Sequence, residues 1–189
     1  MPSPAPTFSA AGFDDDSSPT STPPYRQIRA QYTRSTITVY QAYSASIAVA
    51  AVSTQSLAAS PDFSLSRMTW IKPSWNWMMY RSWYGLKDLR QARILAITMG
   101  RAEFEGLLER ACWDPERDVE LRRLPWRSVQ IGIGRGVCAE WIQDMILRIE
   151  IKALLDQGRT ADAERLVPEE RPYPLPERLR TLLRMDQIE

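Results

Sequence analysis

Hydrophobic and polar positions alternate most regularly between Ser35 and Tyr43, and this alternation predicts a β-strand. One face of the strand would carry Ile37, Val39, Gln41 and Tyr43, and the other face Thr38, Tyr40 and Ala42. Residues with β-branched or aromatic side chains, which favour strands, dominate the run. Ser44 follows as a candidate N-cap for a helix over about residues 45–58.

A tryptophan-rich segment follows, and its pattern changes at Pro73. Residues 67–72 are predicted to be extended, because the residue before a proline is disfavoured in the α region. Ser74 is a candidate N-cap for a helix that continues to about Tyr84, where Gly85 is expected to stop it. The segment therefore predicts a strand followed directly by a helix.

The rest of the chain alternates between short strands and helices. Strands are predicted over residues 93–99 and 127–133, helices over 102–110 and 176–188, and a charged turn or short strand over 113–118. Apolar residues at helical spacing from Val137 to Ala153 predict one long helix with Trp141 on its buried face. These elements, without sustained βαβ alternation, predict an α+β fold in which several helices pack on a mixed or antiparallel sheet.

Length and composition favour a single domain. The chain has 189 residues, 44% of them hydrophobic, which is enough for one core. Residues 1–24 are rich in Pro, Ser, Thr and Asp, and they predict a disordered leader before a single domain over residues 25–189. The formal net charge of +1 gives no argument for nucleic-acid binding through bulk charge.

The chain contains no histidine, which narrows its chemistry. Ser-His and Cys-His mechanisms, an imidazole base and the common His-containing zinc sites are excluded. Cys112 and Cys138 form no close pair and predict buried, reduced thiols in a cytoplasmic protein. No apolar run approaches the ~20 residues of a membrane span, so a soluble protein is expected.

Cations and aromatic side chains are mixed in and around the tryptophan-rich segment. They predict a pocket in which aromatic faces stack on a base or nicotinamide ring while cations hold phosphates. The candidate ligand-binding residues are Arg26, Arg29, Tyr40, Tyr43, Arg67, Trp70, Lys72, Trp77, Arg81 and Arg127. The alternative is that the aromatic residues belong to the core and the cations pair with Asp114, Glu116 or Asp118.

Asp114, Glu116 and Gln130 are the candidate catalytic residues. If residues 113–118 are extended, both carboxylates lie on one face and could act as acid and base or hold a metal, although no metal site is predicted. A turn stabilised by an aspartate before a proline is the alternative. The glycines at 132, 134 and 136 predict a strand-to-helix turn that needs positive φ, or an anion site at a helix N-terminus.

Several segments occur in an order that resembles a known family. They are residues 26–30, 36–44, 67–74 with 77–82, 113–118, 127–132 and 170–176. This set is similar to the motifs of the uncharacterised family catalogued as domain of unknown function 4291, over nearly all of residues 25–185. The resemblance implies no established activity. Trp83 stands where the family pattern usually has glycine, and the span from Phe104 to Trp113 is shorter than the family pattern implies.

Two hypotheses of function follow. The first is an enzyme that binds a nucleotide-type or phosphorylated ligand through Tyr40, Arg67, Lys72 and Arg81, with Asp114, Glu116 or Gln130 at the reacting centre. The NAD-using ADP-ribosyltransferases serve this hypothesis by analogy only. The second is a non-catalytic module for a phosphorylated ligand or single-stranded nucleic acid. The sequence identifies no cofactor.

Overall fold

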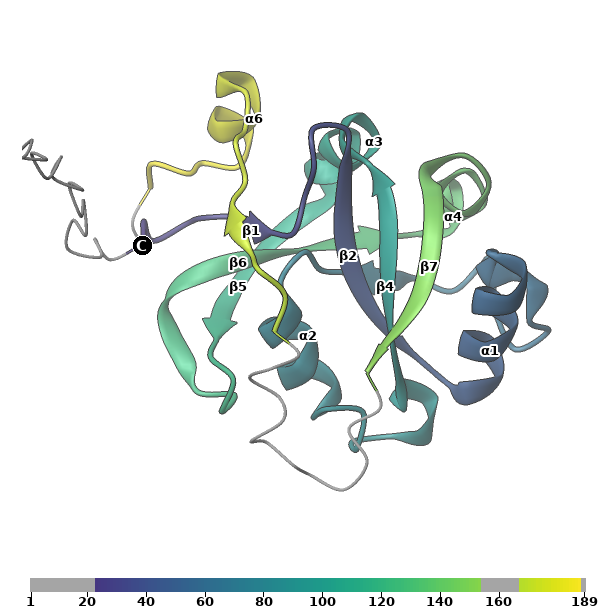
Figure 1. Ribbon diagram of the computed structural model, residues 1–189. Helices are drawn as coiled ribbons and strands as arrows, with labels where there is room; N and C mark the ends of the chain where they lie inside the picture. The colour runs from purple at the N-terminus through teal and green to yellow at the C-terminus, as the bar shows by residue number, and fades with distance from the viewer. Residues whose placement is uncertain (1–22, 154–166, 188–189) are drawn as a thin grey trace, which may run out of the picture.

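Two antiparallel three-stranded sheets form the framework of the computed structural model, which describes residues 23–153 and 167–187 (Figure 1). The first sheet has the order β2 (Thr36–Tyr43), β4 (Arg93–Gly100), β7 (Ile146–Ala153), and the second has the order β3 (Thr69–Ile71), β6 (Arg123–Ile133), β5 (Ala111–Arg117). A short pair, β1 (Arg29–Ala30) with β8 (Arg171–Pro172), is also antiparallel. The predicted α+β fold with an antiparallel sheet is confirmed. The predicted leader falls, as far as residue 22, outside the described residues.

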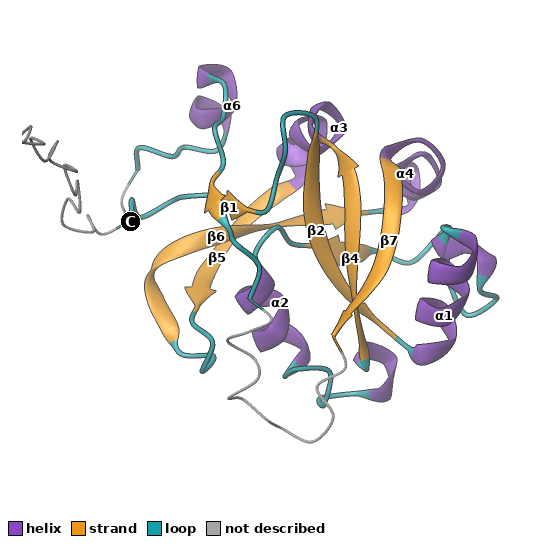
Figure 2. Ribbon diagram, viewed as in Figure 1, coloured by secondary structure: helices purple, strands orange, loops and turns teal. Residues whose placement is uncertain are grey.

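The helices lie around these sheets, as Figure 2 shows. They are α1 (Ala45–Thr54), α2 (Trp75–Ser82), α3 (Arg101–Leu107), α4 (Arg135–Glu140) and α6 (Glu177–Leu182). Short 3₁₀ turns occur at Leu57–Ala59, Leu89–Gln91 and Leu108–Arg110. Within the described residues, no helix is long and apolar enough to cross a membrane.

The two sheets join through the backbones of Tyr40 and Lys72. The amide of Tyr40 donates to the carbonyl of Lys72 at 2.6 Å, and the amide of Lys72 donates to the carbonyl of Tyr40 at 3.1 Å. The strands of the two sheets cross steeply at this junction (Figure 1). Lys72 is thereby fixed beside the middle of β2, directly after β3 and before α2.

The first sheet is covered on both faces. Ile37 and Val39 of β2 belong to the larger hydrophobic cluster, whereas Tyr40 packs with Trp75 and Met79 of α2 in a smaller one. The predicted faces of β2 therefore match the structure, because alternate residues enter different clusters. This arrangement places α2 against one face of β2.

The long helix predicted from Val137 to Ala153 is wrong in its second half. Helix α4 continues through a π-helical turn, Trp141–Met145, and the chain then extends as β7. Trp141 is fully buried, as expected. The outer edge of β7 is bonded by the side chain of Gln55, whose Nε2 donates to the carbonyl of Ile149 at 3.0 Å and whose Oε1 accepts from the amide of Ile149 at 2.8 Å. Partners remote in sequence thus decide the conformation of this segment.

The glycines at 132, 134 and 136 also differ from the prediction. None of them has a positive φ, and Gly85 is the one described glycine that does. At Gly132 the requirement is space, because an added Cβ would lie 3.2 Å from the ring of Trp70. Helix α2 begins after the Ser74 cap as predicted, but its last residue is Ser82 and its C-cap is Trp83, whose φ is 48°.

Candidate functional site

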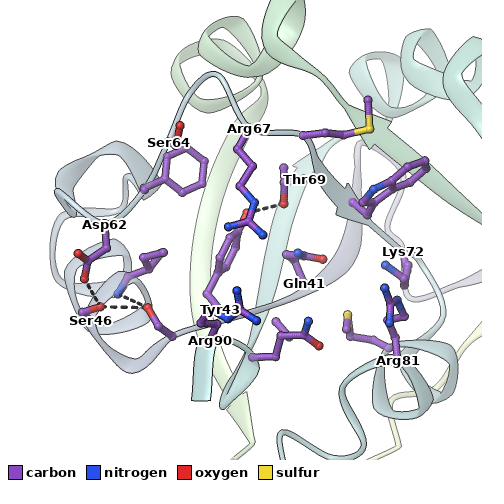
Figure 3. A pocket seen from close by; sticks show the side chains of 18 residues that line it. Gln41, Tyr43, Ser46, Asp62, Ser64, Arg67, Thr69, Lys72, Arg81 and Arg90 are labelled. Carbon is purple, nitrogen blue, oxygen red and sulfur yellow. Dashed lines mark hydrogen bonds between the residues drawn. The ribbon is translucent and has the colours of Figure 1, made fainter. Parts of the chain in front are cut away.

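An open pocket of about 590 Å³ lies beside the junction of the two sheets. Its walls come from the end of β2, the start of α1, the loop before β3, one side of α2 and residues 90–91 (Figure 3). The charged side chains that line it are Arg67, Lys72, Arg81 and Arg90, with Asp62 as the carboxylate. The pocket has an excess of positive charge and therefore suits an anionic ligand.

Two of these arginines are positioned to bind an anionic ligand. Among the described residues, neither the Arg67 nor the Arg81 guanidinium makes an ion pair or a hydrogen bond, and both residues are exposed. Arg90, in contrast, pairs with Asp88 at 2.6 Å. In Figure 3, Arg67 reaches across the middle of the pocket and Arg81 points toward Lys72. Arg67 and Arg81 are thus placed to hold a phosphate or carboxylate.

Lys72 forms part of the pocket wall, although the residue is 1% exposed. Its Nζ lies 4.4 Å from the centroid of the Trp77 ring, a cation–π distance. Burial, followed by the positive charge of Arg81, lowers the pKa of Lys72 to about 7, against a weaker opposing effect of Asp114. A substantial fraction of this amine is therefore uncharged near neutral pH.

The middle of the pocket is polar. The Tyr43 hydroxyl shares a hydrogen bond of 2.9 Å with the Thr69 hydroxyl, and burial raises the pKa of Tyr43, so the phenol stays neutral. Gln41 and Gln91 also line the pocket, and the buried Oε1 atom of each has no hydrogen-bond partner within the part of the chain that the structure describes. Such unsatisfied polar atoms are rare in folded proteins and are suited to a ligand's donors.

Trp70 provides the aromatic wall on the side of the second sheet. It is half-buried, it lines the pocket, and it pairs with Gly132 on β6. Because Gly132 has no side chain, the Trp70 ring can lie over the β6 backbone. An aromatic face is thereby presented beside the cations.

Of the candidate catalytic residues, Asp114 and Gln130 lie on the second sheet next to Lys72 but do not line the pocket. Ile71 pairs with Ile131, so Lys72 is level with Gln130. The Gln130 Nε2 donates to the Asp114 carboxylate at 2.5 Å. The three side chains therefore share one face of the sheet, with Lys72 nearest to the pocket.

Glu116, the third candidate, is buried and supports the start of α2. Its Oε1 accepts hydrogen bonds from the Ser74 hydroxyl at 2.9 Å and from the Arg117 amide at 2.8 Å. Burial raises the pKa of this carboxyl, and the hydrogen bonds act in the opposite direction. The geometry gives Glu116 a structural contact with the helix cap and no access to the pocket.

The candidate arginines at 26, 29 and 127 lie away from the pocket. Arg26 donates to the carbonyl of Arg184 at 2.8 Å, and Arg29 donates to the carbonyl of Glu170 at 2.9 Å. Arg127 donates to the Tyr25 hydroxyl at 2.8 Å. These contacts connect the first and last described segments to the rest of the fold.

Tyr40 and Trp77 are buried aromatic residues and do not line the pocket. Tyr40 is fully buried and packs edge-to-face on Trp75 with ring centroids 5.2 Å apart. Trp77 lies beneath Lys72. The candidates that the structure brings together around the pocket are Tyr43, Arg67, Trp70, Lys72 and Arg81.

Some residues of the site and its surroundings were not among the candidates. Arg90 and Gln91 lie in the 3₁₀ turn capped by Asp88, and no local pattern brings them next to β2. Glu170 accepts a hydrogen bond from the Trp75 amide at 2.6 Å at the start of α2. Burial, followed by the charge of Glu116, raises the pKa of Glu170 to about 8. Glu170 lies in residues 170–176, which resemble a family motif, and this position could have identified it as a candidate from the sequence.

The described residues contain no group of three or more Cys, Asp or Glu side chains that could hold a metal ion together.

We found no match to this chain among the curated proteins or the solved structures. The family model of a domain of unknown function matches residues 27–112 and 110–173, so its two stretches meet inside the span 104–113. The matched residues make up well over half of the chain, and the protein belongs to the family described as domain of unknown function (DUF4291).

Proposed function

We propose that the protein binds a nucleotide-type or phosphorylated small molecule in this pocket and acts on it as an enzyme. The observation that carries the proposal is the convergence of Arg67, Lys72 and Arg81 on one pocket, from positions before β3, after β3 and on α2. Asp62 is the one carboxylate among the described residues that line this pocket. The arginines would hold phosphate oxygens, and Trp70 would stack on a ring. The pocket-lining Lys72 amine, whose pKa is lowered to about 7, favours an enzyme over a passive module.

The size of the pocket favours a small molecule. About 590 Å³ falls within the ~300–1,000 Å³ of ligand sites. A single-stranded nucleic acid would need a groove that tracks several nucleotides. The analogy with ADP-ribosyltransferases adds NAD and ADP-ribose to the ligands worth testing, and nothing beyond that.

The test is isothermal titration with inorganic phosphate, ADP, ADP-ribose, NAD and a ten-nucleotide single-stranded DNA. We expect at least one phosphorylated small molecule to bind, and Arg67→Gln and Arg81→Gln each to weaken it about tenfold, the loss of one charge-assisted hydrogen bond. Arg123→Gln is the matched control, because Arg123 is exposed and does not line the pocket.

Two results would contradict the proposal. The first is that no phosphorylated small molecule binds, and the second is that Arg67→Gln and Arg81→Gln bind as well as Arg123→Gln. Binding of the DNA alone, lost in the pocket variants, would support the non-catalytic module instead.

A further inference from the structure

We propose that Lys72 is a nucleophilic amine that condenses with an aldehyde or ketone group of the phosphorylated ligand to form an imine. This proposal rests on the proposed function, because the phosphate brings the carbonyl group to the lysine. It assigns the chemical class of the ligand, a phosphorylated carbonyl compound, and a reacting atom, Lys72 Nζ.

The surroundings of Lys72 differ from those of a structural lysine. A buried lysine ordinarily pairs with a carboxylate. Within the described residues, no carboxylate lies within ion-pair distance of Lys72, and its Nζ lies over the Trp77 ring at 4.4 Å. The side chain nevertheless forms part of the wall of an open pocket. Among the described residues, no carboxylate therefore has to be displaced from Nζ before it reacts.

The charge of Lys72 also suits nucleophilic attack, which needs an uncharged amine. Burial and the neighbouring Arg81 lower the pKa of Lys72 to about 7. An exposed lysine with a pKa near 10.4 is almost wholly protonated at pH 7.5. Lys87 is exposed and does not line the pocket, so it serves as the control lysine within the same chain.

Arg67 and Arg81 supply the second half of the site. Both line the pocket with Lys72, and Arg81 points toward it (Figure 3). A phosphate held between the two guanidinium groups would place the rest of a small ligand against the Lys72 wall. The same arginines that bind the ligand would therefore orient its carbonyl carbon.

The reaction balances without an oxidant or a metal. The Nζ lone pair forms a bond to the carbonyl carbon, the C=O π electrons move to the oxygen, and that oxygen takes a proton. The nitrogen then loses a proton to solvent, which gives the carbinolamine. Its hydroxyl group takes a second proton, the nitrogen lone pair forms the C=N bond as the C–O bond breaks, and water leaves. Loss of the remaining N–H proton to solvent gives the neutral imine. The product is an imine between Lys72 and the ligand, and water reverses the step.

Pyridoxal phosphate and pyridoxal form a matched pair of aldehyde probes, with and without the phosphate. The full chain is incubated with each probe, reduced with sodium cyanoborohydride and mapped by peptide mass spectrometry. Lys72, Lys87 and Lys152 are the lysines of the sequence, so each can be followed separately. The unmodified protein answers the question without relying on a variant that folds.

We expect pyridoxal phosphate at pH 7.5 to modify Lys72 at least tenfold more than Lys87, and pyridoxal to modify Lys72 at least tenfold less than pyridoxal phosphate does. Lowering the pH to 6 should reduce the Lys72 adduct several-fold, because the amine becomes protonated. Lys87→Arg should leave the Lys72 adduct unchanged, and Lys72→Arg should abolish it while keeping a cation.

The outcomes separate this inference from the proposed function. If ADP or pyridoxal phosphate binds but the adduct lies on Lys87, Lys152 or the N-terminal amine, the binding proposal stands and this inference is overturned. If both probes modify Lys72 equally, Lys72 is a reactive amine, but the phosphate-directed reaction and the phosphate site are both contradicted.

Discussion

Lys72 is the residue at which the backbone, the core and the pocket meet. Its backbone joins the two sheets through Tyr40, and its side chain passes over Trp77 to the pocket. The mixture of lysine, arginine and tryptophan in the sequence was sufficient to nominate Lys72. Its lowered pKa was not predictable, because the burial arises from the packing of α2 against β2 and β5 beside Lys72.

The protonation of Lys72 should be coupled to ligand binding. A phosphate beside Arg67 and Arg81 adds negative charge near Lys72 and raises its pKa above the value of about 7 in the free protein. At pH 8, where most of the free amine is neutral, reversible binding of ADP should therefore take up a proton. Affinity should then decrease as the pH rises from 7 to 9, by up to about tenfold per unit.

Calorimetry of ADP binding in two buffers with different ionisation enthalpies measures this uptake. We expect an uptake of less than one proton at pH 8, because one proton is the limit for a single group and part of the Lys72 amine stays neutral in the complex. In Lys72→Met the uptake should disappear. An equal uptake by the Lys72→Met variant would show that another group, such as the ligand's phosphate, takes the proton.

At the scale of elements, the end of α2 is strained. Trp83 and Tyr84 have φ angles of 48° and 54°, in the left-handed region that favours glycine. The resemblance to the family implies a glycine at the place of Trp83. The Trp83 side chain is 63% exposed, so it recovers little of this cost by burial.

Trp83→Gly should therefore stabilise the protein by about 0.5–1 kcal/mol, because glycine adopts positive φ without strain. Urea denaturation with tryptophan-independent detection, by far-UV circular dichroism, measures the change. Trp83→Ala is the matched control, since it removes the ring but keeps the Cβ and should give no gain. Destabilisation by Trp83→Gly of more than about 1 kcal/mol would mean that the indole makes a contact worth more than the strain.

Local sequence was sufficient for the elements whose partners are near in the chain. Ser44 and Ser74 cap α1 and α2 through their hydroxyl groups, as their positions predicted. It failed for β7, whose apolar spacing also fits a helix and whose strand form depends on β4 and Gln55. The same holds for the residues that line the pocket. Arg67, Lys72 and Arg81 lie close in sequence and were predicted, whereas Arg90 lies in a turn that no sequence pattern places at the site.

At the scale of the whole molecule, two titratable groups with strongly shifted pKa values lie near the start of α2. Lys72 precedes the helix with its pKa lowered to about 7, and Glu170 bonds to the Trp75 amide with its pKa raised to about 8. The unfolded chain binds more protons than the folded protein at Lys72 between pH 7 and about 10.5, so stability from this group rises with pH. At Glu170 the folded protein binds more protons between about 4.5 and 8, so stability from this group falls as the pH rises.

Removing each charge should therefore stabilise the protein with opposite pH trends. Lys72→Met keeps the length of the side chain and its contact with Trp77, and it should stabilise most below pH 7 and progressively less toward pH 10. Glu170→Gln keeps an oxygen to accept from the Trp75 amide, and it should stabilise most above pH 8 and least near pH 5. For each variant, the gain in the free energy of unfolding should change by roughly 1–3 kcal/mol between the two ends of its pH range. A difference of one whole bound proton would give ~1.4 kcal/mol per pH unit. The expected change is smaller, because water and nearby charges relax around the groups.

Urea denaturation of the unmodified protein and both variants at pH 5, 7 and 9 measures these differences. Other titrating groups cancel when each variant is compared with the unmodified protein at the same pH, provided that they do not contact the substituted residue. Curves for the two variants that cross between pH 5 and 9 are the expected result. Parallel curves would mean that the fold holds neither group away from its ordinary pKa. The Lys72 amine would then be charged near neutral pH, and the predicted pH dependence of stability would be wrong.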